Sequence, residues 1–153
     1  MIEQYFYDDK GYNPYLIQDN WQVAQLNYVE KHGLDDMDSI EVHKETDEVF
    51  ILLKGRAVLI AVNVEKDKSL FYEAVNMQQG VSYNIPKGVW HNIAMDKDTQ
   101  IIIVEKSNTH INDCTLWYLT DSERKKLYQS VKDVLWLAGG DGYIYCLGIF
   151  RKW

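Results

Sequence analysis

Short apolar segments recur at regular intervals between residues 40 and 106, and this spacing limits the fold more than any other feature of the sequence. Each segment is rich in β-branched or aromatic residues, and glycines or charged residues separate it from the next. Such spacing is typical of an all-β sandwich or barrel, whereas a parallel sheet would need helices between its strands. The predicted strands of this series are residues 40–43, 48–54, 57–64, 69–77, 81–85, 89–95 and 99–106.

The segments on either side of this series extend the predicted sheets. Residues 21–31 alternate between two faces, as a half-buried strand does, and residues 115–119 form a further short strand. Residues 10–14, which include Gly11 and Pro14, carry a turn signal between two short strands. We therefore expect a single domain, residues 1–153, with its barrel core at about residues 21–119.

One α-helix is predicted near the C-terminus, at about residues 121–137. Thr120 precedes Glu123 by three positions, which is the spacing of a capping box. Apolar residues then recur at helical spacing, and lysines take the opposite face. Gly139 and Gly140 end the helix, and residues 142–151 are predicted to form a last strand. We expect the helix to cover an exposed face of the sheet.

The composition argues against several classes of partner. The 153 residues are 46% hydrophobic and 25% charged, and the net charge is −7. Nucleic acid is not an expected partner, because its backbone needs a basic surface and the longest basic run is Arg124-Lys125-Lys126. No membrane span or secretory signal is expected, since no apolar segment is long enough and no basic region opens the chain. Cys114 and Cys146 match no metal or redox spacing, so reduced thiols of a cytoplasmic protein are expected.

The first candidate site motif lies at the first hairpin of the series. Glu41 and His43 are two positions apart, so a strand places both side chains on the same face. Glu48 follows across a tight turn, and a hairpin can place it opposite Glu41 or His43. One imidazole and two carboxylates are therefore expected to share one surface.

The second motif adds another histidine. His91 follows a turn formed by Pro86 and Gly88, on a strand far along the sequence. If this strand lies beside the first hairpin, two imidazoles and one or two carboxylates converge on one point. Such a set binds a divalent first-row metal ion and leaves coordination positions open for substrate or oxygen.

The spacing within these two motifs resembles that of the cupin superfamily, over somewhat less than half of the chain. The resemblance implies a double-stranded β-helix, which is a jelly-roll barrel, with a divalent metal ion (Fe, Mn, Ni or Zn) bound by the matching side chains. It also implies a homodimer, because cupins often pair their barrels through strands. The matching positions are His43, Glu48, Gly55, Gly80, Pro86, Gly88 and His91.

Two positions depart from the cupin pattern. Glu41 stands where the family has its first histidine, and Met95 stands where the family has a closing asparagine. A carboxylate also binds metal ions, and it gives the site a harder and more negative character. The predicted metal ligands are therefore His43, Glu48, His91 and Glu41.

Each candidate residue also has a purely structural interpretation. His43 and His91 can be buried histidines held by hydrogen bonds, and Glu48 can be a hairpin charge, but the paired spacing favours ligation. His32 and His110 lie in predicted loops and are expected to face solvent.

The sequence leaves two functions open, besides a barrel whose chemistry has decayed and that is retained for interaction alone. A metal-dependent cupin would bind a small polar molecule and transform it, by isomerisation or epimerisation of a sugar-like substrate or by oxygen-dependent cleavage. Asp35, Asp36 and Asp38 form an acidic rim that would not favour an anionic substrate. No nucleophile motif, phosphate loop or dinucleotide fingerprint occurs in the sequence, so acyl transfer and hydride transfer are not expected. The alternative is a non-catalytic barrel that binds or senses a small ligand without a required metal.

Overall fold

The computed structural model describes residues 1–139, so the predicted strand at residues 142–151 lies outside the described residues. The strands are β1 (Gly11–Ile17), β2 (Gln22–Asn27), β3 (Ser39–Val42), β4 (Glu48–Lys54), β5 (Ala57–Val64), β6 (Leu70–Asn76), β7 (Ser82–Ile85), β8 (Trp90–Met95), β9 (Gln100–Glu105) and β10 (Thr115–Tyr118). The helices are η1 (a 3₁₀ helix, Glu30–His32), α1 (Thr109–Asn112) and α2 (Asp121–Gly139).

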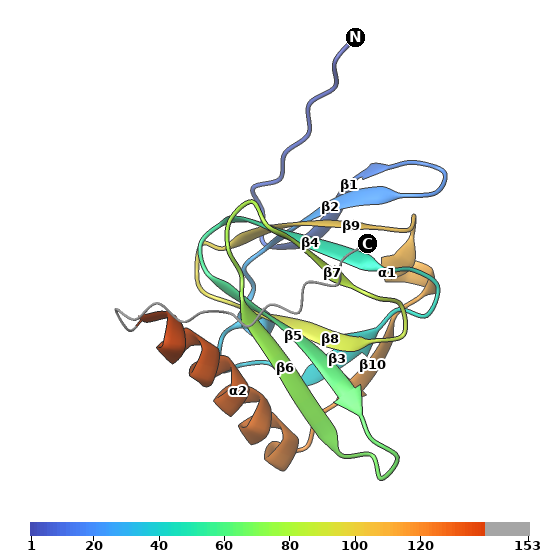
Figure 1. Cartoon of the computed structure of the whole chain (residues 1–153). Coiled ribbons are helices and arrows are strands. Elements are labelled where there is room, and N and C mark those ends of the chain that lie inside the picture. Colours follow the sequence, from blue (N-terminus) through green and yellow to red (C-terminus); the bar gives the residue numbers. More distant parts are fainter. Residues whose placement is uncertain (140–153) are drawn as a thin grey trace, which may run out of the picture.

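The strands form two five-stranded antiparallel sheets that face each other (Figure 1). One sheet has the strand order β1-β2-β9-β4-β7, and the other has the order β10-β3-β8-β5-β6. Strand β9 inserts between β2 and β4, and β8 inserts between β3 and β5, so most connections cross from one sheet to the other. The strand spacing predicts an all-β sandwich or barrel, and the observed topology is the jelly roll that the resemblance of the two motifs implies, with one long helix near the end of the described chain.

Apolar side chains from both sheets fill the space between them. Phe50 and Leu52 in β4, Ile101 and Ile103 in β9, and Leu59 in β5 belong to one buried cluster. They sit at alternate positions, because successive side chains of a strand point to opposite faces. Burying each large side chain of this kind stabilises the fold by about 1.5–3 kcal/mol.

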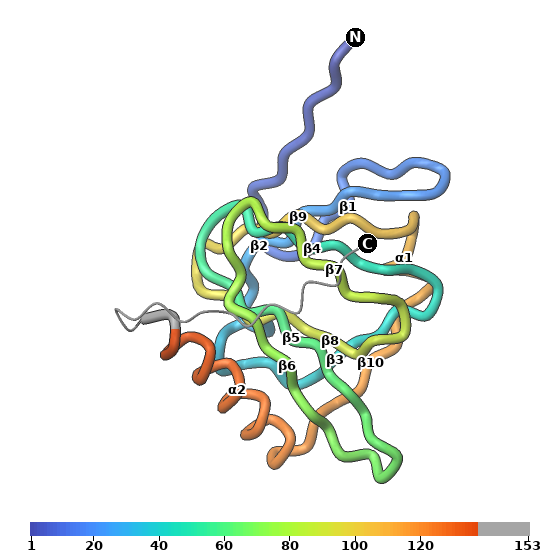
Figure 2. The backbone as a smooth tube through the Cα atoms, viewed as in Figure 1, coloured from blue at the N-terminus to red at the C-terminus, as the bar shows by residue number. Residues whose placement is uncertain are grey.

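Helix α2 covers the outer face of the β5–β6 part of the second sheet, as Figures 1 and 2 show. Leu127 and Val131 are buried in a second cluster that includes Leu70 of β6. The predicted capping box forms, since the Glu123 backbone N–H donates to Thr120 Oγ1 (3.3 Å) and the Thr120 N–H donates to the Glu123 carboxylate (2.7 Å). The predicted helix and its covering role are confirmed.

The turn predicted at residues 10–14 is wrong. These residues largely belong to β1, which pairs with β2 at the edge of its sheet and extends the β-structure ahead of residue 21. The pairing register shifts between Asn13 and Leu16, at the segment that contains Pro14. A proline is tolerated there because an edge strand with a bulge does not need its missing N–H.

Gly55 fixes the turn between β4 and β5. Its φ of +85° lies in the left-handed region, and an added Cβ would lie 2.5 Å from Thr99 Oγ1. The Thr99 hydroxyl in turn bonds to the backbone of Arg56. Only glycine allows this close approach, which joins the β4–β5 turn to the loop before β9.

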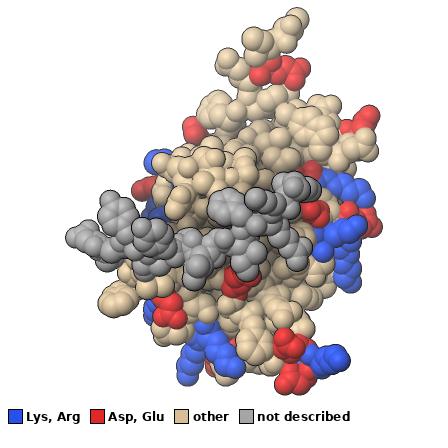
Figure 3. Space-filling view, viewed as in Figure 1, with Lys and Arg blue, Asp and Glu red and all other residues tan. Residues whose placement is uncertain are grey.

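Charged groups are dispersed over the face shown in Figure 3. Lys and Arg side chains occur there in separate groups, with Asp and Glu side chains among them. Among residues 1–139, no helix is long and apolar enough to cross a membrane.

Candidate metal centre

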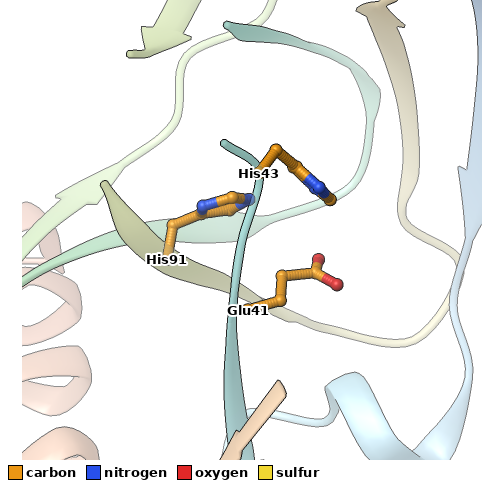
Figure 4. Close-up of side chains that lie close together, drawn as sticks. All are labelled: Glu41, His43 and His91. Atoms are coloured by element: carbon orange, nitrogen blue, oxygen red, sulfur yellow. The ribbon is translucent and has the colours of Figure 1, made fainter. Parts of the chain in front are cut away.

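Strand pairing brings the two sequence motifs together inside the barrel. Glu41 in β3 lies directly opposite His91 in β8. His43 follows the end of β3, and Glu48 is the first residue of β4. Figure 4 shows the side chains of Glu41, His43 and His91 gathered around one space. The four predicted ligands thus come from two adjacent strands of one sheet, β3 and β8, from the turn after β3, and from β4 in the facing sheet.

Glu48 contacts both histidines. Its Oε2 lies 2.7 Å from His91 Nε2 and 3.3 Å from His43 Nε2. The two imidazole ring centroids are 5.3 Å apart, and Phe50 packs its ring edge-on at 5.9 Å from His91. All three polar residues are buried, with relative exposures of 5% for His43 and Glu48 and 1% for His91. A charged group this deep needs a partner, and the three side chains provide it for one another.

The orientation of both imidazole rings is set by backbone carbonyls. His91 Nδ1 lies 2.9 Å from the Val89 carbonyl oxygen, and His43 Nδ1 contacts the Asp113 carbonyl oxygen. A carbonyl oxygen only accepts hydrogen bonds, so each Nδ1 carries a proton and donates it. Both Nε2 atoms are therefore the ones directed at the shared space, which is the arrangement of metal-binding histidines.

Glu48 also sets the charge of the two histidines. Burial opposes a charged His43, but the hydrogen bond and negative charge of Glu48 raise its pKa to about 9. Burial likewise opposes a charged His91, and Glu48 again raises the pKa. Burial opposes ionisation of Glu48, yet the two imidazoles hold its pKa below the usual range. Without a metal the cluster holds protons on Nε2, which a divalent cation replaces when it binds.

Glu41 is half-buried and has a different neighbour. The Cys114 thiol donates to Glu41 Oε2 over 3.3 Å. Partial burial, followed by the negative charge of Glu41, raises the pKa of Cys114 to about 12. The thiol therefore stays protonated and is a poor metal ligand in this state.

The potential ligand atoms form two overlapping groups. Glu41, His43 and His91 offer atoms that all lie within 4.8 Å of one another, and so do His43, Glu48 and Glu105. These residues can hold a metal ion, since imidazole and carboxylate groups at such spacings surround a common point. Glu105 belongs to the second group, although the sequence motifs did not predict it.

Two aspartates join the turns that carry the motifs. The Asp113 carboxylate accepts hydrogen bonds from the backbone N–H groups of Lys44 (2.9 Å) and Glu45 (2.7 Å). Asp47 accepts from the Lys87 N–H over 3.0 Å. The turn after β3 and the turn before β8 are therefore held to each other and to the segment before β10.

A direct backbone contact strengthens this connection. The Gly88 N–H donates to the His43 carbonyl oxygen over 2.6 Å. Gly88 has a φ of +81°, which the turn uses to present its N–H to the other motif.

A cavity of about 210 Å³ opens in front of the ligand atoms. One part of its wall is apolar and consists of Leu26, Phe50, Ile93 and Ile103. The remaining lining residues are polar or sulfur-bearing. They are Tyr12, Lys31, His32, Glu41, His43, Glu48, His91, Asn92, Glu105, His110 and Cys114.

Glu105 anchors a polar cluster on the cavity wall. Its Oε1 accepts hydrogen bonds from the Tyr12 hydroxyl and from Gln22 Nε2 (2.9 Å). Gln22 Nε2 also lies 3.3 Å from His110 Nδ1. Burial and then the charge of Glu48 raise the pKa of Glu105 above its usual range. The alternation of Ile101, Ile103 and Glu105 along β9 is the sequence signal that could have found this residue.

The expectation that His32 and His110 face solvent holds for His110 and is wrong for His32. Both line the cavity, although His110 is exposed on α1. His32 is half-buried at the end of η1, and burial lowers its pKa. Loop position alone did not predict this, because η1 and α1 fold back over the barrel opening.

No protein-family model and no curated protein matches the chain. Many solved structures are similar to it, among them the following three. A Streptomyces PAC13 structure with uridine is 13% identical, with a TM-score of 0.52 over 80% of this chain and 98% of that one. BH2720 from Bacillus halodurans is 18% identical, with a TM-score of 0.50 over 72% and 80%. A cupin-2 domain protein from Shewanella frigidimarina is 22% identical, with a TM-score of 0.46 over 66% and 84%. At these identities the likeness to the first two structures shows the fold alone.

Proposed function

The chain has the cupin fold, and we propose that it binds one divalent metal ion and holds a small polar molecule against that ion. His43, His91 and Glu48 would be the central ligands, with Glu41 completing the set. The observation that carries this proposal is the common direction of the two buried Nε2 atoms and the Glu48 carboxylate. The bound ion would act as a Lewis acid and orient the molecule.

The donor set favours hard metal ions. Glu41 takes the place of a histidine and adds a carboxylate, while the Cys114 thiol is protonated and bonded to Glu41. Carboxylate and imidazole ligands without thiolate suit Mn²⁺ and Fe²⁺, and Ni²⁺ and Zn²⁺ also accept them. Two histidines and a carboxylate leave open positions, so isomerisation of a sugar-like substrate or oxygen-dependent chemistry fits this site.

A second candidate function is a small-ligand barrel that needs no metal. Its support is that Glu48 already satisfies both imidazoles without an ion. An ion-paired cluster of this kind can line a pocket and bind a ligand by hydrogen bonds alone. Uridine, which accompanies the PAC13 structure, is a suitable first ligand for this alternative.

Elemental analysis of the untagged protein, purified without chelator, tests the first proposal. We expect one equivalent of Fe, Mn, Ni or Zn in the parent and none in His91→Ala. The same measurement is repeated after supplementation with each metal. An absence of bound metal in the parent under all these conditions would favour the metal-independent barrel.

A further inference from the structure

We propose that Glu105, supported by Tyr12 and Gln22, forms a second binding pole in the cavity, which selects uncharged polyhydroxy molecules. The inference rests on the proposed metal site, because the ligand would bridge the ion and Glu105. In this inference Glu105 hydrogen-bonds the bound small molecule and does not coordinate the metal ion.

The hydrogen bonds of Glu105 leave one oxygen for a ligand. Its Oε1 accepts from both Tyr12 and Gln22, which holds the carboxyl group in place. Within residues 1–139, Oε2 makes no hydrogen bond, and Glu105 lines the cavity. A carboxyl oxygen on a side chain that is only 6% exposed is a strong binding group, because water competes little there.

The distance to the metal ligands suits a single hydroxyl group or two adjacent ones. Ligand atoms of Glu105, His43 and Glu48 all lie within 4.8 Å of one another. An ion held by His43 and Glu48 would therefore lie near the Glu105 carboxyl group, and a hydroxyl oxygen on that ion would lie within its reach. A hydroxyl oxygen bound to the ion can therefore point its proton at Glu105.

A hydroxyl group also fits Glu105 in either protonation state. It donates to a carboxylate and accepts from a carboxylic acid, so the pairing does not depend on the charge of Glu105. An anionic ligand, by contrast, would meet the carboxyl groups of Glu41, Glu48 and Glu105 in one small space. Lys31 is the only Lys or Arg along the described cavity lining, and it is exposed.

The apolar part of the cavity wall narrows the class of small molecule that fits the site. Leu26 and Ile103 from one sheet, and Ile93 from the other, line the same cavity as the polar groups. A sugar ring presents C–H groups on its faces and hydroxyl groups at its edge, so it matches a cavity with both kinds of surface. We therefore assign the site to a neutral, ring-forming polyol such as a pentose.

The test compares D-ribose with its anionic oxidation product, D-ribonate. The protein is loaded with Mn²⁺ and dialysed, and its metal content is measured first. Calorimetry then gives the Kd of each compound, and Mn²⁺-induced line broadening of the sugar protons confirms contact with the site. The variants are Glu105→Gln, which keeps the side-chain shape, and Glu105→Leu, which removes both oxygens. Glu45→Gln, on an exposed glutamate paired with Lys106, is the matched control.

We expect the parent and Glu45→Gln to bind ribose at least about tenfold more tightly than ribonate, the size of one lost charged hydrogen bond. Glu105→Gln should keep its Mn²⁺ and reduce this preference about tenfold, and Glu105→Leu should lose ribose binding. Loss of Mn²⁺ from folded Glu105→Gln would overturn the inference by making Glu105 a metal ligand. An unchanged preference, tighter ribonate binding, or no binding of ribose by the Mn²⁺-loaded parent would also overturn it.

Failure of the metal proposal is recognised separately. If the parent takes up none of Fe, Mn, Ni or Zn, the proposed function is wrong, and the same titrations are made with the metal-free protein. If the metal-free parent then prefers ribose to ribonate and Glu105→Gln removes this preference, the second pole is still supported. If the metal-free parent shows no such preference, the second pole is overturned.

Discussion

Glu48 and Glu105 are almost equally buried, yet their pKa values shift in opposite directions. Their exposures are 5% and 6%. Glu48 faces two imidazoles, which lower its pKa against the effect of burial. Glu105 faces neutral donors and the charge of Glu48, so burial prevails and its pKa rises. Burial alone therefore does not set the charge of a carboxyl group, because the partners favour the charged form of Glu48 and the neutral form of Glu105.

The largest expected effect separates the two carboxyl groups by metal affinity. Glu48→Gln should weaken Mn²⁺ binding at least about 100-fold, because it removes a charged ligand from the site. Glu105→Gln should change the affinity less than about threefold, since the amide keeps the bonds to Tyr12 and Gln22. Competition titration with a chromophoric chelator measures both. Equal losses of Mn²⁺ affinity in the two variants would contradict the different roles proposed for Glu48 and Glu105.

The pH dependence of metal binding is the next largest effect. His43 has a pKa of about 9 in the metal-free cluster, so a proton must leave Nε2 before the ion binds. Below that pH, the apparent affinity should rise about tenfold for each pH unit and proton released. Calorimetry in two buffers of different ionisation enthalpy counts the protons. A flat profile between pH 6 and 8 would contradict the ion-paired cluster.

A smaller effect should follow from loosening the support of His43. Asp113→Asn keeps the backbone carbonyl that contacts His43 but weakens the carboxylate bonds to Lys44 and Glu45. We expect about a tenfold loss of Mn²⁺ affinity. This is the low end of the range of about 10- to 100-fold for residues that hold metal ligands in place. The Co²⁺ absorption spectrum should shift in the same variant. Asp67→Asn, in a hairpin remote from the cavity, is the control and should change neither.

The smallest effect concerns the stability of the metal-free protein. The pKa of His43 is raised on folding, so its contribution is complete below the unfolded value of about 6.5 and is lost as pH rises through 9. The urea midpoint should therefore fall over this range. The fall should be much smaller in Glu48→Gln, where only the weaker effects of the Asp113 carbonyl and of the Glu41 charge raise the pKa of His43. A midpoint that rises with pH in the parent would show that His43 is neutral.

The strand series could be predicted from the sequence because it depends on local features. The predicted bounds of residues 48–54 and 57–64 match β4 and β5, and the turns at Gly55 and Gly88 adopt positive φ values. The approach of Glu41 and His43 to His91 followed from motif spacing and strand alternation. The predicted hairpin pairing of Glu48 with Glu41 or His43 is wrong, because β3 and β4 lie in different sheets and Glu48 reaches the two histidines from the facing sheet. Their role as metal ligands stays a prediction.

The second pole could not be predicted in the same way. Glu105 reaches the cavity because β9 inserts between β2 and β4, which are distant in sequence. Its partners Tyr12 and Gln22 come from β1 and β2, where the turn signal at residues 10–14 was misleading. Asp113 acts partly through its backbone carbonyl, and a carbonyl carries no residue-specific signal. Long-range pairing and main-chain contacts were therefore the information that the sequence patterns lacked.

The contact between the Gly88 N–H and the His43 carbonyl has a consequence for how the ion would enter. Because the two turns are already joined, the ordering entropy of the site is lost during folding and not during binding. Metal uptake should therefore be fast and should need no refolding, and a chelator should leave the barrel intact. Exchange of the ion would then be limited by its release from the donors and not by motion of the chain.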